Sequence, residues 1–313
     1  MRDVLIEELC SIARRDPDVY FIAADLGAAA LDSFREELPR QFIHSGISEQ
    51  NMIDVAAGLA TCGKKVYCYA MSSFITARCY EQIKVALGAM NQPVTLISVG
   101  VGMGYDDAGP THYTTEDIAI MRALPGIEVL SPADAESTLA IARHTHAKPA
   151  FRYLRLERPA LPPVYQGDFA AALPAGFARV APGSKVAIVS SGYMLHRSLE
   201  ARALLAAQGV EPAVFDLFRV KPLDPAALVA ALAPYDAVVT VEEQWLAGGF
   251  GSVVLEAFSD VGSTKRVVRI GLPDRWFFEN GGRKPVLDAF GLGVADIARA
   301  VGELHSSPGR EGA

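Results

Sequence analysis

Glu49 is the first residue whose type and position could do chemistry. It follows the polar turn 44–48 and starts a helix, because the apolar residues between Met52 and Ala60 recur at helical spacing. An acid held on a packed helix could bind a ligand or hold a proton for it. Local physics alone explains a first-turn carboxylate by its favourable interaction with the helix dipole. The residues leave both interpretations open.

The residues that flank this helix are suited to position the acid. Gly46 lets the backbone turn tightly before the helix, and Gly63 is expected to end it, as glycines just past a helix commonly do. Ser45 or Ser48 can cap the exposed amides of the first turn. We therefore expect the Glu49 carboxylate to be held in one place.

A histidine lies in the most irregular stretch of the first half, the glycine-rich loop 100–115. Glycines allow the backbone of this loop to approach a ligand closely. Thr114 and Asp117 are spaced as a capping pair for the next helix, so His112 would stand on a short, pinned arm. The loop has neither the lysine of a P-loop nor the GxGxxG pattern, which excludes a glycine-rich phosphate loop.

Composition and charge limit the classes of partner. The chain has 313 residues, 50% of them hydrophobic, and a formal net charge of -7 without a basic run. We expect two domains of ordinary size and no nucleic-acid partner. No apolar stretch is long enough to cross a membrane, and residues 1–15 are typical of an amphipathic helix rather than a signal peptide. Four cysteines without CxxC spacing indicate reduced, core or near-core thiols in a cytoplasmic protein: Cys10, Cys62, Cys68 and Cys79.

Strands and helices alternate in the first half of the chain, which predicts a largely parallel sheet. The expected strands are 19–23, 66–70, 94–99 and 128–130, and the expected helices are 4–12, 49–62, 74–87, 116–124 and 133–143. Open α/β sheets bind ligands where strands end in loops. Asp25 follows one such strand, and Ser73, Phe74 and Arg78 follow another beside the Glu49 turn.

The second half repeats this alternation after a proline-rich stretch. Its expected strands are 185–190, 213–217, 237–242 and 266–270, and its expected helices are 198–207, 225–232 and 251–260. We predict an α/β protein of two three-layer α/β domains, 1–158 and 183–305, with a linker at 159–182 and a disordered tail at 306–313. The pair Glu242 and Glu243 is expected to be solvated or salt-bridged, without a catalytic role.

Three stretches taken together resemble the carboxyl-terminal half of transketolase, in order and at matching separations. They are GISEQNMIDVAAGLA, SSFITARCYEQI and AGPTHYTTEDIAIMRALPG. The resemblance covers nearly the whole chain, since the segment after residue 180 is similar to the last domain of that family. It implies a thiamine-diphosphate pyrimidine-binding domain with a mostly parallel sheet, followed by a transketolase C-terminal-like domain.

The resemblance implies roles for several residues. Glu49 would hydrogen-bond N1′ of the aminopyrimidine of thiamine diphosphate, which favours the imino tautomer whose 4′-nitrogen can remove the thiazolium C2 proton. Phe74 matches an aromatic that stacks on the pyrimidine, and Arg78 matches the basic position near it. His112 matches the histidine of the GPTH run, which handles substrate hydroxyls and protons. The remaining residues expected around the cofactor are Asp25, Ile47, Met71 and Ser73.

The same resemblance implies a substrate with an anionic tail. Arg2 and Arg155 match arginines that grip the substrate phosphate in the family, and Arg152 is a rival for the second of these positions. The expected substrate is therefore a sugar or a sugar phosphate.

Three polar positions of the family pattern are missing from this chain. They fall on Ala29, Gly100 and Ala108, and Asp107 could substitute for the last if the loop shifts. A site that hydrogen-bonds a group discriminates strongly for it, and alanine or glycine removes that discrimination. The substrate thus need not be an ordinary sugar phosphate.

The chain contains no GDG run, which in the family holds Mg²⁺ and the diphosphate together with a later asparagine. The resemblance therefore implies a separately encoded amino-terminal subunit that supplies these ligands, with the cofactor between the chains and a heterotetramer as the assembly. One alternative is a decarboxylating subunit similar to 1-deoxyxylulose-5-phosphate synthase or to the beta subunit of 2-oxoacid dehydrogenases, since PAFRYLR looks like an RYPR element of the synthase. Another is a non-catalytic structural subunit.

Overall fold

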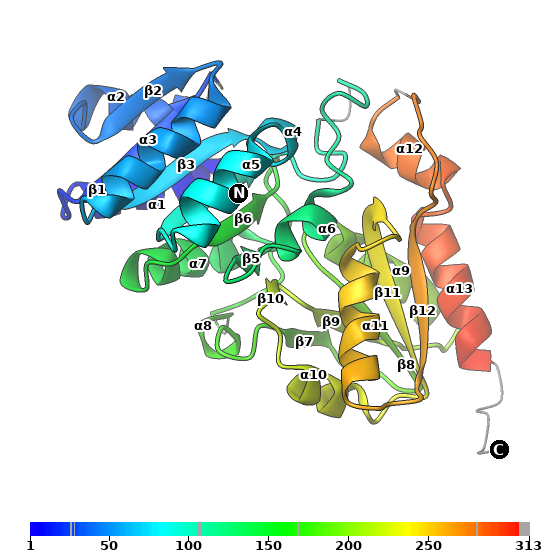
Figure 1. The fold of residues 1–313 in the computed structure, drawn as a ribbon. Coiled ribbons are helices and arrows are strands. Elements are labelled where there is room, and N and C mark those ends of the chain that lie inside the picture. Colours follow the sequence, from blue (N-terminus) through cyan, green and yellow to red (C-terminus); the bar gives the residue numbers. More distant parts are fainter. Residues whose placement is uncertain (26, 28, 106–107, 168, 280, 307–313) are drawn as a thin grey trace.

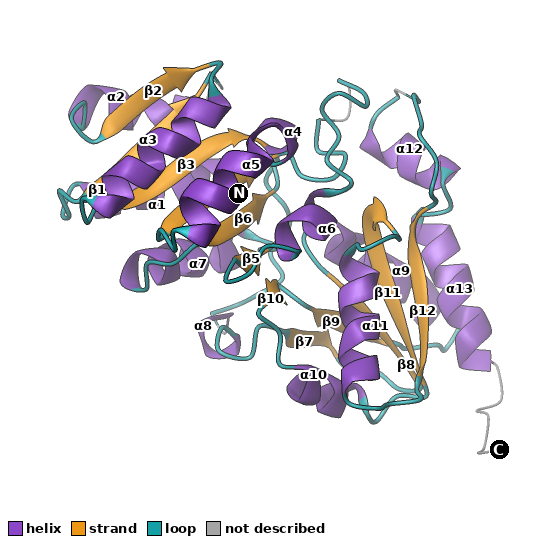
Figure 2. Cartoon of the chain, in the orientation of Figure 1, coloured by secondary structure: helices purple, strands orange, loops and turns teal. Residues whose placement is uncertain are grey.

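Two mostly parallel sheets organise the chain (Figure 1, Figure 2). The computed structural model describes residues 1–25, 27, 29–105, 108–167, 169–279 and 281–306. The first sheet contains, in spatial order, β10 (Arg219–Lys221), β5 (Glu128–Leu130), β6 (Arg152–Leu156), β4 (Val94–Val99), β3 (Lys65–Met71), β1 (Val19–Ala24) and β2 (Phe42–Gly46). The second contains β12 (Arg266–Leu272), β11 (Ala237–Trp245), β8 (Val186–Ser190), β9 (Ala213–Asp216) and β7 (Ala178–Ala181). The predicted α/β fold class is confirmed.

Helices cover both faces of each sheet, and one apolar core is common to the two sheets. They are α1 (Arg2–Ala13), α2 (Asp32–Glu37), α3 (Glu49–Thr61), α6 (Asp117–Arg122), α7 (Ala135–Ala147), α8 (Phe169–Ala172), α9 (Tyr193–Ala206), α10 (Pro225–Leu232), α11 (Phe250–Asp260), α12 (Arg283–Ala289) and α13 (Val294–Ser306). The apolar core beneath α3 and α6 continues into the core beneath α10 and α11. The other faces pack separately, against α1 and α7 in the first sheet and against α9 and α13 in the second. No helix among the described residues has the length and apolar character needed to cross a membrane.

The single helix predicted over 74–87 is wrong, because the chain divides there into short turns. These are α4 (Ser72–Ile75), a 3₁₀ turn (Ala77–Cys79), α5 (Tyr80–Gln82) and a π-helix (Ile83–Ala89). The Thr76 hydroxyl donates to the carbonyl of Ser72 at 2.7 Å, and the Cys79 thiol donates to the carbonyl of Phe74 at 3.0 Å. Such side-chain bonds to the preceding turn bend or interrupt helices.

Other elements differ from the predictions in their bounds. The α1 helix starts at Arg2 rather than at residue 4, and α9 starts at Tyr193 rather than at residue 198. The sequence pattern did not predict β2, β7, β10, α2, α8, α12 or α13. Of the four free thiols, those of Cys10, Cys68 and Cys79 are buried as expected, whereas Cys62 is exposed.

The stretch 159–182 contains structure of its own and is fastened to α7. Its members α8 and β7 lie where the sequence predicts a linker. The Asp134 carboxylate accepts hydrogen bonds from the amides of Val164 at 2.8 Å and Tyr165 at 2.9 Å. These bonds fix the chain as it passes from the first sheet to the second.

A buried ion cluster joins the two sheets. Arg283, at the start of α12, donates to both oxygens of Glu157, at 2.7 and 3.0 Å, and its Nε donates to Glu243 at 2.9 Å. Glu157 follows β6 and Glu243 lies in β11, and all three side chains are buried. Glu243 also accepts the amide hydrogen of Met103, at 3.3 Å. The expected salt bridge thus exists for Glu243, but it is buried rather than solvated.

The neighbouring Glu242 is also buried, and it has a different partner. Its two oxygens accept the amides of Phe250, at 2.6 Å, and Gly251, at 2.8 Å, at the start of α11. Burial raises the pKa of this carboxyl to about 7. Glu242 thus fastens a helix to β11.

We expect Arg283→Met to lower the free energy of unfolding by about 3–5 kcal/mol, because it leaves two buried carboxylates without their cation. Denaturant unfolding of the full chain measures this. The matched control is Arg299→Met, since Arg299 is 64% exposed where it pairs with Asp296, and we expect a change within about 0.5 kcal/mol. A loss for Arg283→Met as small as that of the control would show that Arg283 does not stabilise the two buried carboxylates.

Asp216 at the end of β9 makes stability depend on pH. Burial raises the pKa of its carboxyl to about 8, and the Tyr165 hydroxyl donates to it at 2.7 Å. The folded chain therefore keeps a proton that the unfolded chain has lost, so we expect the free energy of unfolding to fall as pH rises from about 4 to about 8. Asp216→Asn keeps an acceptor for Tyr165 but cannot lose a proton. Denaturation of this variant at several pH values should show a smaller fall in the free energy of unfolding as pH rises. An unchanged slope would contradict the assignment, and exposed Asp288→Asn is the control.

Candidate active site

The Glu49 carboxylate stands at the first turn of α3, where the sequence places it. Its side chain is 5% exposed, and Arg78 Nη1 donates to Oε2 at 2.7 Å. The backbone on both sides adopts the conformations expected of glycine, with φ of 68° at Gly46 and 81° at Gly63. Amides of Gly63 and Lys64 bond back to the last turn of α3 and end the helix. The acid is therefore rigidly positioned.

The predicted serine cap of α3 is wrong. Ser48 occupies the N-cap position, but its side chain accepts no hydrogen bond from the helix. Its hydroxyl instead donates to the Ser45 carbonyl, and the Ser45 hydroxyl donates to the Ala23 carbonyl at 3.2 Å. Ser48 thus bonds within the turn, and Ser45 bonds the turn to β1. Neither hydroxyl is left to cap the helix.

A cavity of about 280 Å³ opens in front of Glu49. Six predicted cofactor-binding residues line it together with Ala24: Asp25, Ile47, Glu49, Met71, Phe74 and Arg78. The seventh, Ser73, is not among the lining residues, and its buried hydroxyl has no hydrogen-bond partner among the described residues. The carboxyl ends of β1, β2 and β3 thus bring together residues that lie far apart in the sequence.

Charged and aromatic groups follow one another at the edge of this cavity. The Arg78 guanidinium lies 4.0 Å from the centre of the Phe74 ring. The Phe74 ring also meets His112 in an edge-to-face arrangement, with ring centres 5.4 Å apart. The Thr111 hydroxyl lies 2.8 Å from His112 Nδ1. His112 is therefore beside the Glu49 cavity, as the sequence predicts.

The arm that carries His112 is pinned differently from the prediction. Gly102 and Thr114 exchange backbone hydrogen bonds of 2.8 and 3.2 Å, which close the base of the loop. The predicted capping pair is wrong, because α6 has Glu116 at its N-cap without a side-chain cap. The Asp117 carboxylate instead accepts hydrogen bonds from Arg155 at 2.7 Å and from the Tyr153 hydroxyl at 2.9 Å.

The structure does not bring the three predicted substrate arginines together at the cavity. Arg155 is buried and donates to Asp117 and, at 3.0 Å, to Ser131. Arg152 is buried and paired with Glu128. Arg2 is partly exposed and bonds Asp3 at 2.8 Å. The predicted substrate contact Asp107 lies outside the described residues.

Sequence reasoning missed Tyr105, which lies beside His112, and Arg158, which lies beside Tyr105. The ring of Tyr105 is centred 6.0 Å from His112, and the Arg158 guanidinium lies 5.1 Å from the centre of the Tyr105 ring. The one signal in the sequence is that Tyr105 lies in the glycine-rich loop. Arg158 gives no signal, because it stands next to the proline-rich stretch that reads as a linker.

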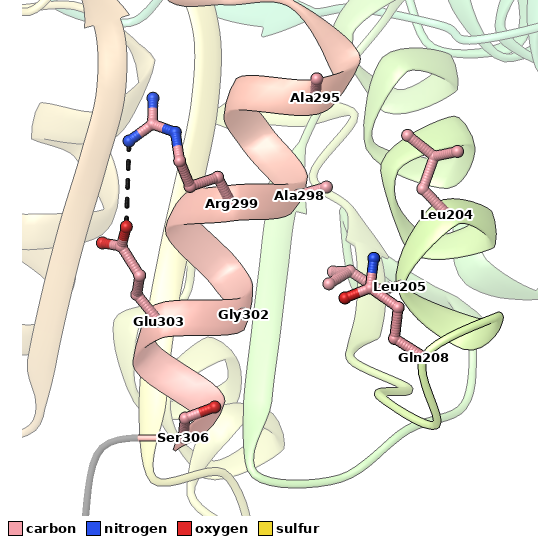
Figure 3. Close-up of a pocket in the computed structure, with 9 residues that line it drawn as sticks. All are labelled: Leu204, Leu205, Gln208, Ala295, Ala298, Arg299, Gly302, Glu303 and Ser306. Carbon is pink, nitrogen blue, oxygen red and sulfur yellow. Dashed lines mark ion pairs between the residues drawn. The ribbon is translucent and has the colours of Figure 1, made fainter.

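A larger cavity of about 610 Å³ lies between α9 and α13 and carries no comparable chemistry (Figure 3). Alanine and leucine side chains form much of its lining, and the ion pair in view joins Arg299 to Glu303 at 3.9 Å. Size alone therefore does not mark the site. In the described part of the chain, no three or more His, Cys, Asp or Glu side chains form a group that could hold a metal ion.

Comparisons with known proteins match both halves of the chain. The family "Transketolase, pyrimidine binding domain" matches residues 1–163, and "Transketolase, C-terminal domain" matches residues 176–297. One of the subunits of the apulose-4-phosphate transketolase of Phocaeicola vulgatus is 32% identical over 274 residues, which are 87% of this chain and 87% of that protein. The 1-deoxy-D-xylulose-5-phosphate synthase of Nitratidesulfovibrio vulgaris is 36% identical over 98% of this chain, which spans only 48% of the synthase.

A solved structure agrees with this result over the whole fold. A split gene transketolase, described as an inactive beta4 tetramer, superposes with a TM-score of 0.87 at 31% identity, over 97% of this chain and 98% of that chain. The resemblance found in the sequence is therefore confirmed. The chain belongs to the transketolase family, of which it carries the pyrimidine-binding domain and the C-terminal domain.

Proposed function

We propose that this chain is the carboxyl-terminal subunit of a split transketolase-like enzyme that uses thiamine diphosphate. With a separately encoded amino-terminal subunit, it would transfer a two-carbon ketol unit from a ketose or ketose phosphate to an aldehyde. The observation that carries this proposal is the buried Glu49 carboxylate in a cavity that also contains Phe74 and Arg78. The similarity to a transketolase subunit of nearly equal length supports it.

The cavity fits the aminopyrimidine ring of thiamine diphosphate. Met71, Phe74 and Ala24 offer apolar surface to a flat ring. Arg78 donates a hydrogen bond to Oε2 of Glu49, and no described residue donates one to Oε1. One carboxylate oxygen is thus left for a ligand. When bound, thiamine diphosphate supplies a nucleophilic carbon that can cleave the bond beside a carbonyl group.

Some residues of this chain would bind the cofactor, and others would bind the substrate. Glu49 holds a proton at N1′ of the aminopyrimidine, and Arg78 keeps its carboxylate in place. Phe74 would orient the pyrimidine ring, and Arg78 lies over the ring of Phe74 itself. His112, beside Phe74, exchanges protons with substrate hydroxyls. Of the three predicted arginines we assign only the partly exposed Arg2 to an anionic substrate group, because Arg152 and Arg155 are buried with partners of their own.

The remaining parts of the active site would come from the partner subunit. We propose that it holds Mg²⁺ and the diphosphate and that two copies of each chain form a heterotetramer. The related split-gene structure, described as an inactive tetramer of beta chains alone, supports both self-association and the need for a second subunit. Three buried free thiols fit a reducing compartment and support a cytoplasmic location.

A decarboxylating enzyme is the second candidate, supported by the 36% identity to a 1-deoxy-D-xylulose-5-phosphate synthase. The deciding experiment mixes the chain with its partner subunit, thiamine diphosphate, Mg²⁺ and an aldehyde acceptor, and supplies either a ketose phosphate or pyruvate. Mass spectrometry of an acceptor lengthened by two carbons at the expense of the ketose would establish ketol transfer. Release of CO₂ from pyruvate alone would establish decarboxylation instead. No turnover of either donor would favour a non-catalytic subunit.

We expect Glu49→Gln to lower kcat/KM of the assembled enzyme by about 10²–10⁴-fold, because the amide cannot hold the proton at N1′. The matched control is Glu256→Gln, since Glu256 is a 56% exposed glutamate that also pairs with an arginine and lies on α11, and its activity should not change. Size-exclusion chromatography checks that both variants assemble. A fully active Glu49→Gln enzyme would show that Glu49 does not activate the cofactor.

A further inference from the structure

We propose that Tyr105 is the specificity-determining residue of this site and that, with Arg158, it binds an oxyanion group of the substrate, a phosphate or a carboxylate. This inference rests on the proposed function, because it concerns the substrate of the same site. It assigns an anion-binding role to two residues that were not among the site residues predicted from the sequence.

The first support is a continuous row of side chains that leads from the Glu49 cavity to Tyr105. The row starts with Arg78 over Phe74, continues to His112, and reaches Tyr105 with ring centres 6.0 Å apart. Arg158 ends the row, 5.1 Å from the centre of the Tyr105 ring. Tyr105 is therefore the next ring beyond His112 in this row, and Arg158 is the cation that follows it.

The second support is that the Tyr105 ring packs tightly against a loop in which two glycines leave room for it. Gly100 has φ of 77°, and a Cβ atom there would lie 2.1 Å from Cε2 of Tyr105. A Cβ atom at Gly104 would lie 2.9 Å from the backbone of Gly100, so the loop is folded tightly beneath the ring. The ring occupies the volume that a side chain at position 100 would need. Tyr105 is only 8% exposed, so its hydroxyl is presented from a rigid support.

The third support is the hydrogen-bonding capacity that the described residues leave unused. No described residue forms a hydrogen bond with the Tyr105 hydroxyl, and Arg158 is exposed without an acidic partner among the described residues. A phenol is protonated at neutral pH, and burial raises the pKa of Tyr105 further above its ordinary value, so its hydroxyl is a donor. Arg2 is close enough to interact electrostatically with the same phenol. One phenol and two guanidinium groups form a set of donors that suits an oxyanion.

The chemistry predicts selectivity for substrates with a charged end. An arginine fork bonds phosphate or carboxylate oxygens, and a phenol can add one further hydrogen bond. A neutral ketose offers no charge to pair with Arg158, so it should gain little from this group. The preference should therefore depend on the Tyr105 hydroxyl and on the charge of Arg158.

The test compares Tyr105→Phe and Arg158→Met in the assembled enzyme. We measure kcat/KM with a ketose phosphate, with a ketose that ends in a carboxylate, and with an uncharged ketose. For at least one charged donor we expect a fall of about tenfold or more in both variants, with the uncharged donor unchanged. The sensitive donor identifies the oxyanion as phosphate or carboxylate. Tyr20→Phe is the control, because Tyr20 lies on β1 beside Lys64, away from this row.

A second readout does not depend on turnover. Calorimetry of inorganic phosphate, and separately of acetate, with the assembled enzyme should show weaker binding of one anion in Arg158→Met than in wild type. Equal losses of activity with charged and neutral donors would mean that the two residues act only structurally and would overturn the proposal, as would unchanged kinetics in both variants. An enzyme that binds the anion through Arg158 but transfers no ketol unit would overturn the proposed function and leave the anion site standing.

Discussion

The Arg283 guanidinium, buried between carboxylates from both sheets, is the interaction on which the arrangement of this molecule depends. Separating buried charges costs much free energy. Glu157, which follows β6, and Glu243, which lies in β11, are therefore held at a fixed separation by Arg283. Glu243 also accepts the amide of Met103, within the loop that carries His112. The second domain therefore takes part in the site by fixing that loop, although it contributes no residue to the Glu49 cavity.

Parallel pairing then decides which side chains meet. The strands β1, β2, β3 and β4 end at one edge of the sheet, and each is followed by a residue of the site or by the loop that carries one. Asp25 follows β1, Glu49 follows β2 after a short turn, and Phe74 follows β3. The apolar face of α3 packs against this sheet, so Glu49 cannot move without unpacking Met52 and Ile53 from the core. The position of the acid is thus a consequence of the fold.

The features that sequence reasoning found depend on neighbouring residues, and those it missed depend on distant ones. The Glu49 helix and its two flanking glycines follow from a local pattern, and the structure has them. The expected serine cap failed because Ser45 found an acceptor on β1. An arginine in a strand gives no sign of its partner, so Arg155 could not be known to bond Asp117, 38 positions away. Tyr105 depends on a ring packed over Gly100, which no spacing in the sequence reveals.

Burial of an acid does not by itself mark a catalytic group, as the four buried glutamates of the described chain show. Both oxygens of Glu157, Glu242 and Glu243 accept hydrogen bonds from Arg283 or from backbone amides. The cavity beside these three measures only about 10 Å³, which is too small for any ring. Glu49 alone combines an oxygen without a donor and a cavity of about 280 Å³. Unused hydrogen-bonding capacity next to open space is therefore what distinguishes Glu49, the acid that we propose to be functional, from the other three buried glutamates.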